Sequence, residues 1–238
     1  MFPIRDHNPS GRVPYVTYAL MAANIGIFLS MLPISGDERA FSQLYYNWAL
    51  LPHRVMGGEG YAALLTSQFL HAGWMHIAGN MLFLWIFGDN VEDEMGHLPY
   101  LGFYLLAGAL SGYAHVISDP ASFVPMVGAS GAIAGVMGGY LLLFPKARID
   151  VLFIIKIITI PAWIMLVLWF VMQFTGSILT LPGQGGIAYW AHTGGFVAGF
   201  LLALPLWVKL GGKQFWRKTH GHPPHPPARY GMPKVKRK

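Results

Sequence analysis

The sequence predicts an all-α fold: a polytopic membrane protein built as a bundle of six transmembrane helices. The first observation is composition, since 54% of the residues are apolar and only 11% are charged. A soluble domain usually carries about 25% charged residues. The second is that the apolar residues gather in six long segments. The third is that glycines recur four residues apart in two of these segments, a spacing that lets membrane helices approach closely.

The six segments are justified by length, because a spanning helix needs roughly 20 mostly apolar residues. They are residues 15–32, 68–87, 98–117, 130–144, 157–174 and 187–208. The fourth is short, and the fifth contains Pro161. The residues before the first segment are polar and do not resemble a signal peptide, so we expect that segment to be a membrane span.

The polar stretches between these segments suggest the domain organisation. We expect an N-terminal segment 1–13, a six-span domain 14–209, and a basic, proline-rich tail 210–238. The connection 33–67 is too polar to span and rich in aromatic residues, so we expect it to lie in the membrane interface, where Trp48 is well placed. The tail has no acidic residue, and it is short and proline-rich. We therefore expect a solvated, positively charged flank and predict no nucleic-acid partner.

Basic residues set the expected orientation. They gather in three places: Arg5 and Arg12 before the first span, Lys146 and Arg148 between the fourth and fifth, and the tail after Lys209. With six spans these places share one side, predicted to be cytoplasmic by the excess of lysine and arginine. The acidic string "GDNVEDEMG" (88–96) is expected to connect the second and third spans on that side. We therefore expect a multi-pass protein of the cell inner membrane with both termini in the cytoplasm.

Polar residues at membrane depth are costly and need a reason. In "FLHAGWMHIAGNM", His76 and Asn80 are four residues apart and share one helix face, whereas His71 does not share it well. Hydrogen bonding between helices is the plain explanation for such a pair. A metal site is weaker, because the His-Glu-x-x-His spacing is missing and the chain has no cysteine. No metal or cofactor is predicted.

The string "MVGASGAIAGVMGGY" places a serine at the start of an apolar helix. It lacks the Gly-x-Ser-x-Gly elbow of α/β-hydrolases, because Ala132 occupies the last glycine position. The plain explanation of Ser130 is a helix N-cap. Free backbone N–H groups and the helix dipole at this position would also stabilise a nearby anion.

The last span carries a histidine in "YWAHTGGFVAGF". Gly195 and Gly199 there match the spacing of Gly131 and Gly135 in the fourth span, so the two stripes are expected to pack together. That packing brings Ser130 next to His192 near the outer ends of both helices. A serine beside a histidine is an activated nucleophile.

His76, Asn80 and the backbone N–H of Ser130 are the candidate donors to a developing oxyanion. No acidic residue stands close to His192 in the sequence, so a Ser-His dyad is favoured over a triad.

Taken together, "HAGWMHIAGNM", "GDNVEDEMG", "GASGAIAG" and "AHTGGFVAGF" occur in an order that resembles the rhomboid intramembrane serine proteases, over about residues 15–208. The resemblance implies a six-helix bundle with a site below the outer membrane surface. It implies Ser130 as nucleophile, His192 as base, and His76 with Asn80 at the oxyanion.

The resemblance also assigns roles to glycines. Gly128 matches the glycine before the nucleophile, and Gly195 and Gly199 match close-packing glycines. The implied substrates are single-span membrane proteins, with the lipid bilayer as the other partner. Two departures stand out: Ala134 and Gly79 replace aromatic residues that some members carry near the histidine and before the oxyanion asparagine.

Two other functional classes remain to be separated from a protease. One is a catalytically inactive relative that binds membrane clients, although all four polar residues of the implied site are present. The other is a transporter or channel, for which paired charges at mid-membrane are typical. Only Lys156 is charged within the apolar runs, near the inner end, where its side chain can snorkel.

Overall fold

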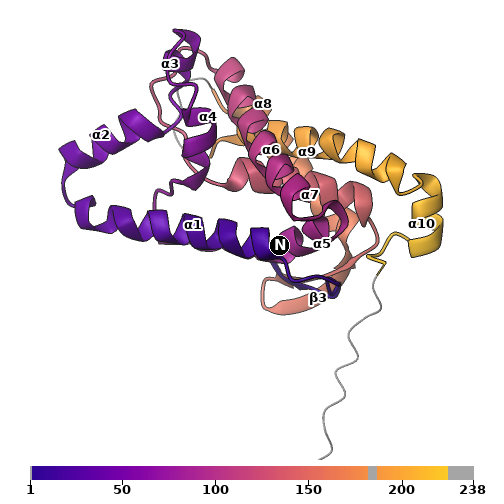
Figure 1. Cartoon of the computed structure of the whole chain (residues 1–238). Helices are drawn as coiled ribbons and strands as arrows, with labels where there is room; N and C mark the ends of the chain where they lie inside the picture. Colours follow the sequence, from indigo (N-terminus) through magenta and orange to yellow (C-terminus); the bar gives the residue numbers. More distant parts are fainter. Residues whose placement is uncertain (1, 182–186, 225–238) are drawn as a thin grey trace, which may run out of the picture.

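A computed structural model describes residues 2–181 and 187–224 (Figure 1). The described chain is mostly helical, with one small antiparallel sheet beside the bundle. The six long helices are α1 (Tyr15–Met31), α5 (Trp74–Met95), α6 (His97–Ser118), α7 (Ser130–Leu143), α8 (Ala162–Leu179) and α9 (Tyr189–Lys209). The predicted helical, polytopic fold is confirmed.

Not all six helices are equally apolar. Helices α1, α6, α8 and α9 are long and apolar enough to cross a membrane, and α7 is apolar but only 14 residues long. Helix α5 has a polar final third, because the acidic string 88–96 is helical almost to its end and does not form a loop. The expected connection between the second and third spans is therefore reduced to Gly96.

Two predicted helix starts are wrong for local reasons. The second span was expected from residue 68, but α5 begins at Trp74, after the extended Leu70 and Gly73. The fifth was expected to fall within 157–174 and to contain Pro161, but α8 is Ala162–Leu179 and excludes that proline. Pro161 is its extended N-cap, with ψ 142°, because a proline disfavours a helix before it and suits a helix start.

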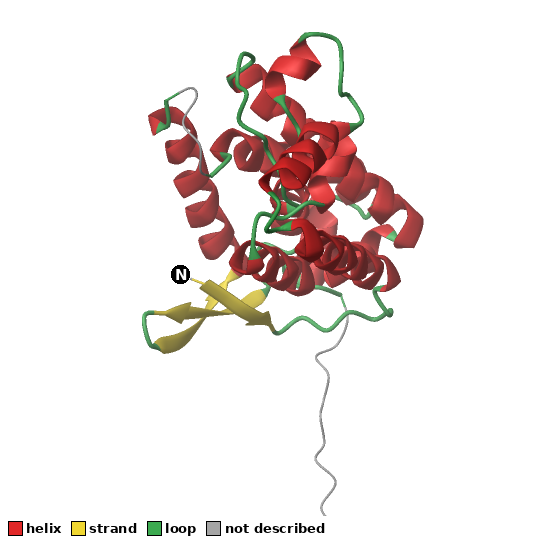
Figure 2. Cartoon of the chain, turned by 90° about the vertical axis from the view of Figure 1, so that its left-hand side faces the viewer, coloured by secondary structure: helices red, strands yellow, loops and turns green. Residues whose placement is uncertain are grey.

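The sheet was not predicted. Its strands are β1 (Phe2–Asp6), β2 (Arg148–Phe153) and β3 (Lys156–Pro161), antiparallel in the order β1-β2-β3. It lies beneath one end of the helices, and α8 rises from it at the side of the bundle (Figure 2). The sheet thus joins the start of the chain to the connection between α7 and α8.

A buried carboxylate adds side-chain contacts among the paired strands of the sheet. Asp150 accepts hydrogen bonds from Arg5 Nε at 2.7 Å and Thr159 Oγ1 at 2.6 Å, and its third partner is His7 Nε2 at 2.7 Å. Burial alone would raise the pKa of Asp150, but the hydrogen bonds from Thr159, His7 and Arg5 lower it to about 2. The carboxylate therefore stays ionised and links all three strands.

A second buried carboxylate caps α1 from another helix. Pro14 is the N-cap residue of α1 and supplies no side-chain cap. Glu92 of α5 supplies it instead: Oε1 accepts from the Val16 N–H at 2.9 Å, and Oε2 accepts from the Thr17 N–H at 2.8 Å and from Thr17 Oγ1 at 2.7 Å. Oε1 also lies 2.6 Å from His97 Nδ1. This explains why an acidic residue is buried at the end of an apolar helix.

Glu92→Gln is expected to lower the free energy of unfolding by about 2–4 kcal/mol, because an amide nitrogen would face donors that now meet an oxygen. Thermal unfolding in detergent measures the loss. Glu38→Gln, at an exposed first-turn position of α2, is the matched control and should change stability by a few tenths of a kcal/mol. Equal midpoints for the two variants would contradict the capping role.

The three basic stretches lie at one end of the bundle. The N-terminal strand pairs with β2, which follows Lys146 and starts at Arg148. The chain after α9 forms α10 (Lys213–Thr219), whose Trp216 Nε1 donates to Leu142 O at 2.9 Å. The structure thus groups the positions on which the orientation was predicted. Residues 225–238 of the expected tail lie outside the described residues.

The connection 33–67 is folded as short helices at the opposite end. These are α2 (Glu38–Trp48), α3 (Pro52–Met56) and α4 (Ala63–Thr66), flanked by the 3-10 turns η1 (Leu32–Ile34) and η2 (Ser67–Phe69). Asp37 caps α2 by accepting from the Arg39 and Ala40 N–H groups. Leu50 and Met126 exchange two backbone hydrogen bonds, at 3.0 and 2.8 Å, which ties this connection to the segment before α7.

Helix α7 is the centre of the bundle. All of its residues except Ser130 and Leu141 are buried. It touches α9 through main-chain atoms: a Cβ on Gly199 would overlap Gly135, and a Cβ on Gly195 would overlap the carbonyl of Gly131. The packing of the two glycine stripes, expected from the sequence, is present.

Candidate active site

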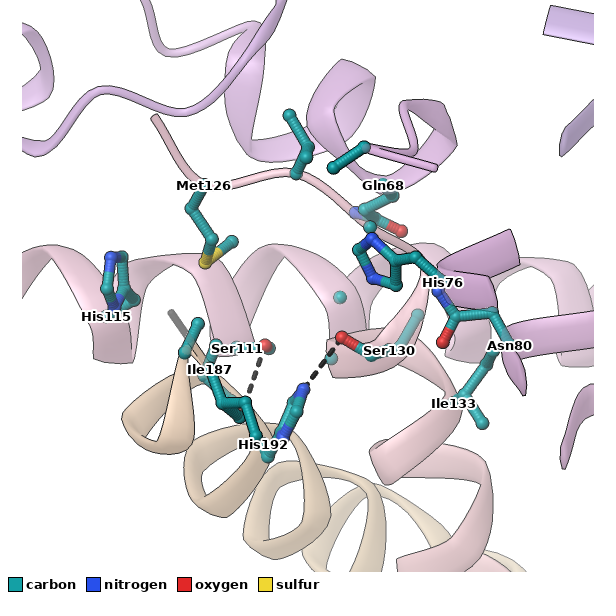
Figure 3. A pocket seen from close by; sticks show the side chains of 18 of the residues that line it. Gln68, His76, Asn80, Ser111, His115, Met126, Ser130, Ile133, Ile187 and His192 are labelled. Atoms are coloured by element: carbon teal, nitrogen blue, oxygen red, sulfur yellow. Dashed lines mark hydrogen bonds between the residues drawn. The ribbon is translucent and has the colours of Figure 1, made fainter. Parts of the chain in front are cut away.

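A cavity of about 560 Å³ lies at the end of the bundle away from the sheet. Its walls come from α5, α6, α7, α8 and α9 and from the segment before α7. Figure 3 shows Ser130 and His192 pointing toward one another in its wall, with His76 and Asn80 nearby. The cavity therefore gathers the four polar residues that the sequence singled out.

Ser130 is the first residue of α7, and His192 lies in the first turn of α9. The distance from Ser130 Oγ to His192 Nε2 is 2.8 Å (Figure 3). Both residues are half-buried. The main-chain contacts between the glycine stripes bring the two helix ends this close, beginning at Gly131, next to Ser130, and at Gly195, one turn after His192.

Ser130 does not act as the N-cap of its helix. The N-cap is Ala129, with φ −69° and ψ −11°, and it makes no side-chain capping bond. As the first helical residue, Ser130 has a backbone N–H with no partner inside the helix. Its hydroxyl is turned to His192, and its N–H is placed at the positive end of the α7 dipole.

His192 has a second partner that was not predicted from the sequence. Its Nδ1 lies 2.8 Å from Oε1 of Gln173, a buried residue of α8. The indole of Trp169, one turn earlier on α8, lies 5.9 Å from the imidazole, centroid to centroid. The ring that faces Ser130 is thus contacted by α8 on its other side.

The signal for Gln173 was available in the sequence. A glutamine inside an apolar span is costly and calls for a partner, as His76 and Asn80 did. The third member of a triad is usually a carboxylate, and an amide does not stand out in that role. Gln173 also precedes His192 by 19 residues and lies on another helix.

His76 and Asn80 lie on one face of α5, as their spacing predicts. A Cβ on Gly128 would lie 2.7 Å from His76 Nε2 and 3.7 Å from Asn80 Nδ2, so both groups reach over this glycine. Gly128 has φ +127°, a backbone conformation that favours glycine. Its N–H donates to Ser67 O at 2.9 Å, which fixes the segment before the serine.

His71 has a different place from the one expected. It precedes α5, so helical spacing does not apply to it, and it is buried. Its Nε2 lies 2.9 Å from Asn80 Nδ2 and accepts a hydrogen bond from that amide. His71 therefore orients Asn80.

Comparison with known proteins shows which family this chain is similar to. Residues 58–209 match the family profile of the Rhomboid domain, which is more than half of the chain. The chain is 31% identical over 199 residues to "Rhomboid protease GluP" of Bacillus subtilis, covering 84% of this chain and 36% of that protein. It is 28% identical over 196 residues to "Rhomboid protein 1, mitochondrial" of Saccharomyces cerevisiae, covering 78% of this chain and 51% of that protein.

A human relative shows the same partial coverage. "Presenilin-associated rhomboid-like protein, mitochondrial" of Homo sapiens is 29% identical over 161 residues, which cover 67% of this chain and 38% of that protein. The chain therefore spans about half or less of the length of these relatives. With the domain match and the apolar helices, they establish a multi-pass membrane protein. The chain belongs to the rhomboid family.

Proposed function

We propose that this protein is an intramembrane serine endopeptidase that cleaves transmembrane segments of membrane proteins. The observation that carries the proposal is the 2.8 Å contact between Ser130 Oγ and His192 Nε2 on the wall of a cavity that His76 and Asn80 also line. A hydroxyl bonded to an imidazole in this way is the arrangement of an activated nucleophile. The relative from Bacillus subtilis, named a rhomboid protease, supports the same reaction class.

The proposed reaction uses these two residues in turn as nucleophile and base. Ser130 Oγ attacks the scissile carbonyl carbon while its proton passes to His192 Nε2. The tetrahedral intermediate then collapses: the C–N bond breaks, and His192 gives the proton to the leaving amine. Water, deprotonated by His192, then attacks the ester carbonyl of the acylated Ser130. The C–O bond to Ser130 breaks, and His192 returns the proton to Ser130 Oγ, which restores the free enzyme.

The negative oxygen of the intermediate needs donors placed in advance. The Ser130 N–H, His76 and Asn80 are the proposed donors, and Gly128 leaves room for them because it carries no side chain. Gly131, Gly195 and Gly199 have a supporting role, since they hold α7 against α9.

Asn80→Ala is expected to lower kcat by about 10²–10³-fold, the cost of one oxyanion donor, while Ser130 remains reactive. Initial rates of reporter cleavage measure the effect. Asn47→Ala, on the exposed face of α2, is the control and should leave kcat unchanged. An Asn80→Ala enzyme with the wild-type kcat would remove Asn80 from the site.

The proposal extends to placement and substrate. Residues 14–209 form the protease domain, with 33–67 in the membrane interface and the basic end of the bundle in the cytoplasm of a cell inner membrane. The cavity then opens toward the outer side. Single-span proteins are the proposed substrates, because a span unwound near its outer end presents a carbonyl at this depth. Glycine or proline in such a span makes unwinding easier.

The test uses the full chain in liposomes with a single-span reporter and a fluorophosphonate probe. The expected result is cleavage within the reporter span and covalent labelling at Ser130, located by peptide mass spectrometry. Client binding without cleavage or labelling would instead identify an inactive relative. Flux of a solute across the liposomes with no cleavage would identify a transporter or channel.

A further inference from the structure

We infer that Gln173 is a positioning residue that selects the reactive tautomer of His192; the inference rests on the proposed function. The catalytic base in that function must present an unprotonated Nε2 to the Ser130 hydroxyl. A neutral imidazole carries its one proton on Nδ1 or on Nε2, and the partner of the other nitrogen decides which. The partner of His192 Nδ1 is therefore part of the machinery, although it touches neither the nucleophile nor the substrate carbonyl.

The geometry specifies the tautomer. Gln173 Oε1 lies 2.8 Å from His192 Nδ1, and a carbonyl oxygen can only accept. Nδ1–H therefore donates to Gln173. The lone pair of Nε2 then faces Ser130 Oγ at 2.8 Å, so the hydroxyl donates to it. The chain of two hydrogen bonds has one consistent direction, from serine through histidine to glutamine.

Burial makes this contact effective. Gln173 is 8% exposed, so its carbonyl oxygen has little competition from water. Trp169 on the same helix contacts the imidazole with ring planes tilted by 34° and limits its rotation. An amide without charge thus occupies the place where soluble serine proteases carry a carboxylate. In an apolar bundle an amide avoids the cost of burying a charge.

Helix α8, which carries Gln173, also contacts α9 at other positions along its length. Ser177 Oγ lies 2.9 Å from Thr193 Oγ1, and the Phe170 and Phe196 rings are 4.9 Å apart. A Cβ on Gly176 would overlap the ring of Tyr189. These contacts fix α8 without touching His192, so Gln173 can be replaced with the two helices still in place.

The experiment compares Gln173→Leu, Gln173→Glu and the control Ser177→Ala in the full chain. Leucine removes the acceptor and suits an apolar helix, and kcat is expected to fall by about 10–100-fold with KM within about twofold. Glutamate keeps an acceptor at the same reach and is expected to restore kcat to within about threefold of wild type. Ser177→Ala removes a buried hydrogen bond of α8 and should keep the wild-type kcat.

A spectroscopic measurement makes the test independent of cleavage. In protein labelled with ¹⁵N-histidine, the His192 signals are assigned by their loss in His192→Ala. Wild type and Ser177→Ala should show Nδ1 protonated and Nε2 unprotonated, and Gln173→Leu should show a mixture of tautomers.

Three results would overturn the inference: Nε2 protonated in the wild type, a Gln173→Leu enzyme within twofold of the wild-type kcat, or a Gln173→Glu enzyme as slow as Gln173→Leu. A wild-type protein that cleaves nothing while His192 holds its proton on Nδ1 would contradict the proposed function and leave the tautomer assignment intact.

Discussion

Ser130→Ala is expected to abolish cleavage, with a loss in kcat of about 10⁶-fold, the order found when a serine nucleophile is removed from a triad enzyme. The physical reason is that no other hydroxyl is placed at 2.8 Å from His192 Nε2 within the described residues. His192→Ala is expected to cost nearly as much. The double variant should be no slower than either single one, because two residues that act in one proton transfer fail together.

Measurement requires a reporter assay whose range covers about six orders of magnitude in rate, run beside fluorophosphonate labelling. Ser111→Ala is the matched control: Ser111 is a second serine in the cavity wall, and it donates to Ala191 O at 2.7 Å (Figure 3). Its loss should leave Ser130 labelled and most of the activity in place. Cleavage at the wild-type rate by Ser130→Ala would refute the proposed nucleophile.

Gly199→Val is expected to have the largest effect on the fold of the site. A Cβ on Gly199 would overlap main-chain atoms of Gly135, which cannot change rotamer to make room. Overpacking of this kind typically costs 1–3 kcal/mol and occasionally more, and an obstacle made of backbone favours the upper end, about 3 kcal/mol. The helices must separate, so Ser130 and His192 lose their contact.

Thermal unfolding and Ser130 labelling together measure this effect. Gly199→Ala should show a smaller loss of both, because one methyl group displaces α7 less than an isopropyl group. Gly102→Val, on α6 where an added Cβ would meet no atom within 4 Å, should keep wild-type stability and labelling. A Gly199→Val protein that is as stable and as reactive as wild type would contradict the close packing of α7 and α9.

The helices of the bundle were predictable because burial in a membrane requires long apolar segments. The sheet was not. Residues 148–153 and 156–161 are rich in apolar and β-branched residues, but they stand beside a span, and only their pairing makes them strands. The pairing of β1 with β2 joins Arg5 to Asp150, which are 145 residues apart. A single sequence carries no signal for a contact between residues so far apart.

The candidate site also has a part that was predictable from the sequence and a part that was not. Ser130 and His192 were predictable as neighbours because two glycine stripes and a shared membrane side constrain their helices. His76 and Asn80 were predictable as a pair because helical spacing places them on one face. The role of Gln173 was harder to predict, because its contact with His192 Nδ1 depends on how α8 is rotated about its axis. The expectation that this span contains Pro161 was itself wrong, because Pro161 ends strand β3.

The main-chain contact between α7 and α9 has a consequence for how the proposed active site responds to the surrounding lipids. Bilayers of different thickness tilt membrane helices, and the packing between helices decides which of them tilt together. Helices α7 and α9 touch backbone to backbone and should tilt as one body, so the distance between Ser130 and His192 should vary little with lipid chain length. Helix α8 touches α9 through side chains, and thickness should therefore act on catalysis through the contact with Gln173.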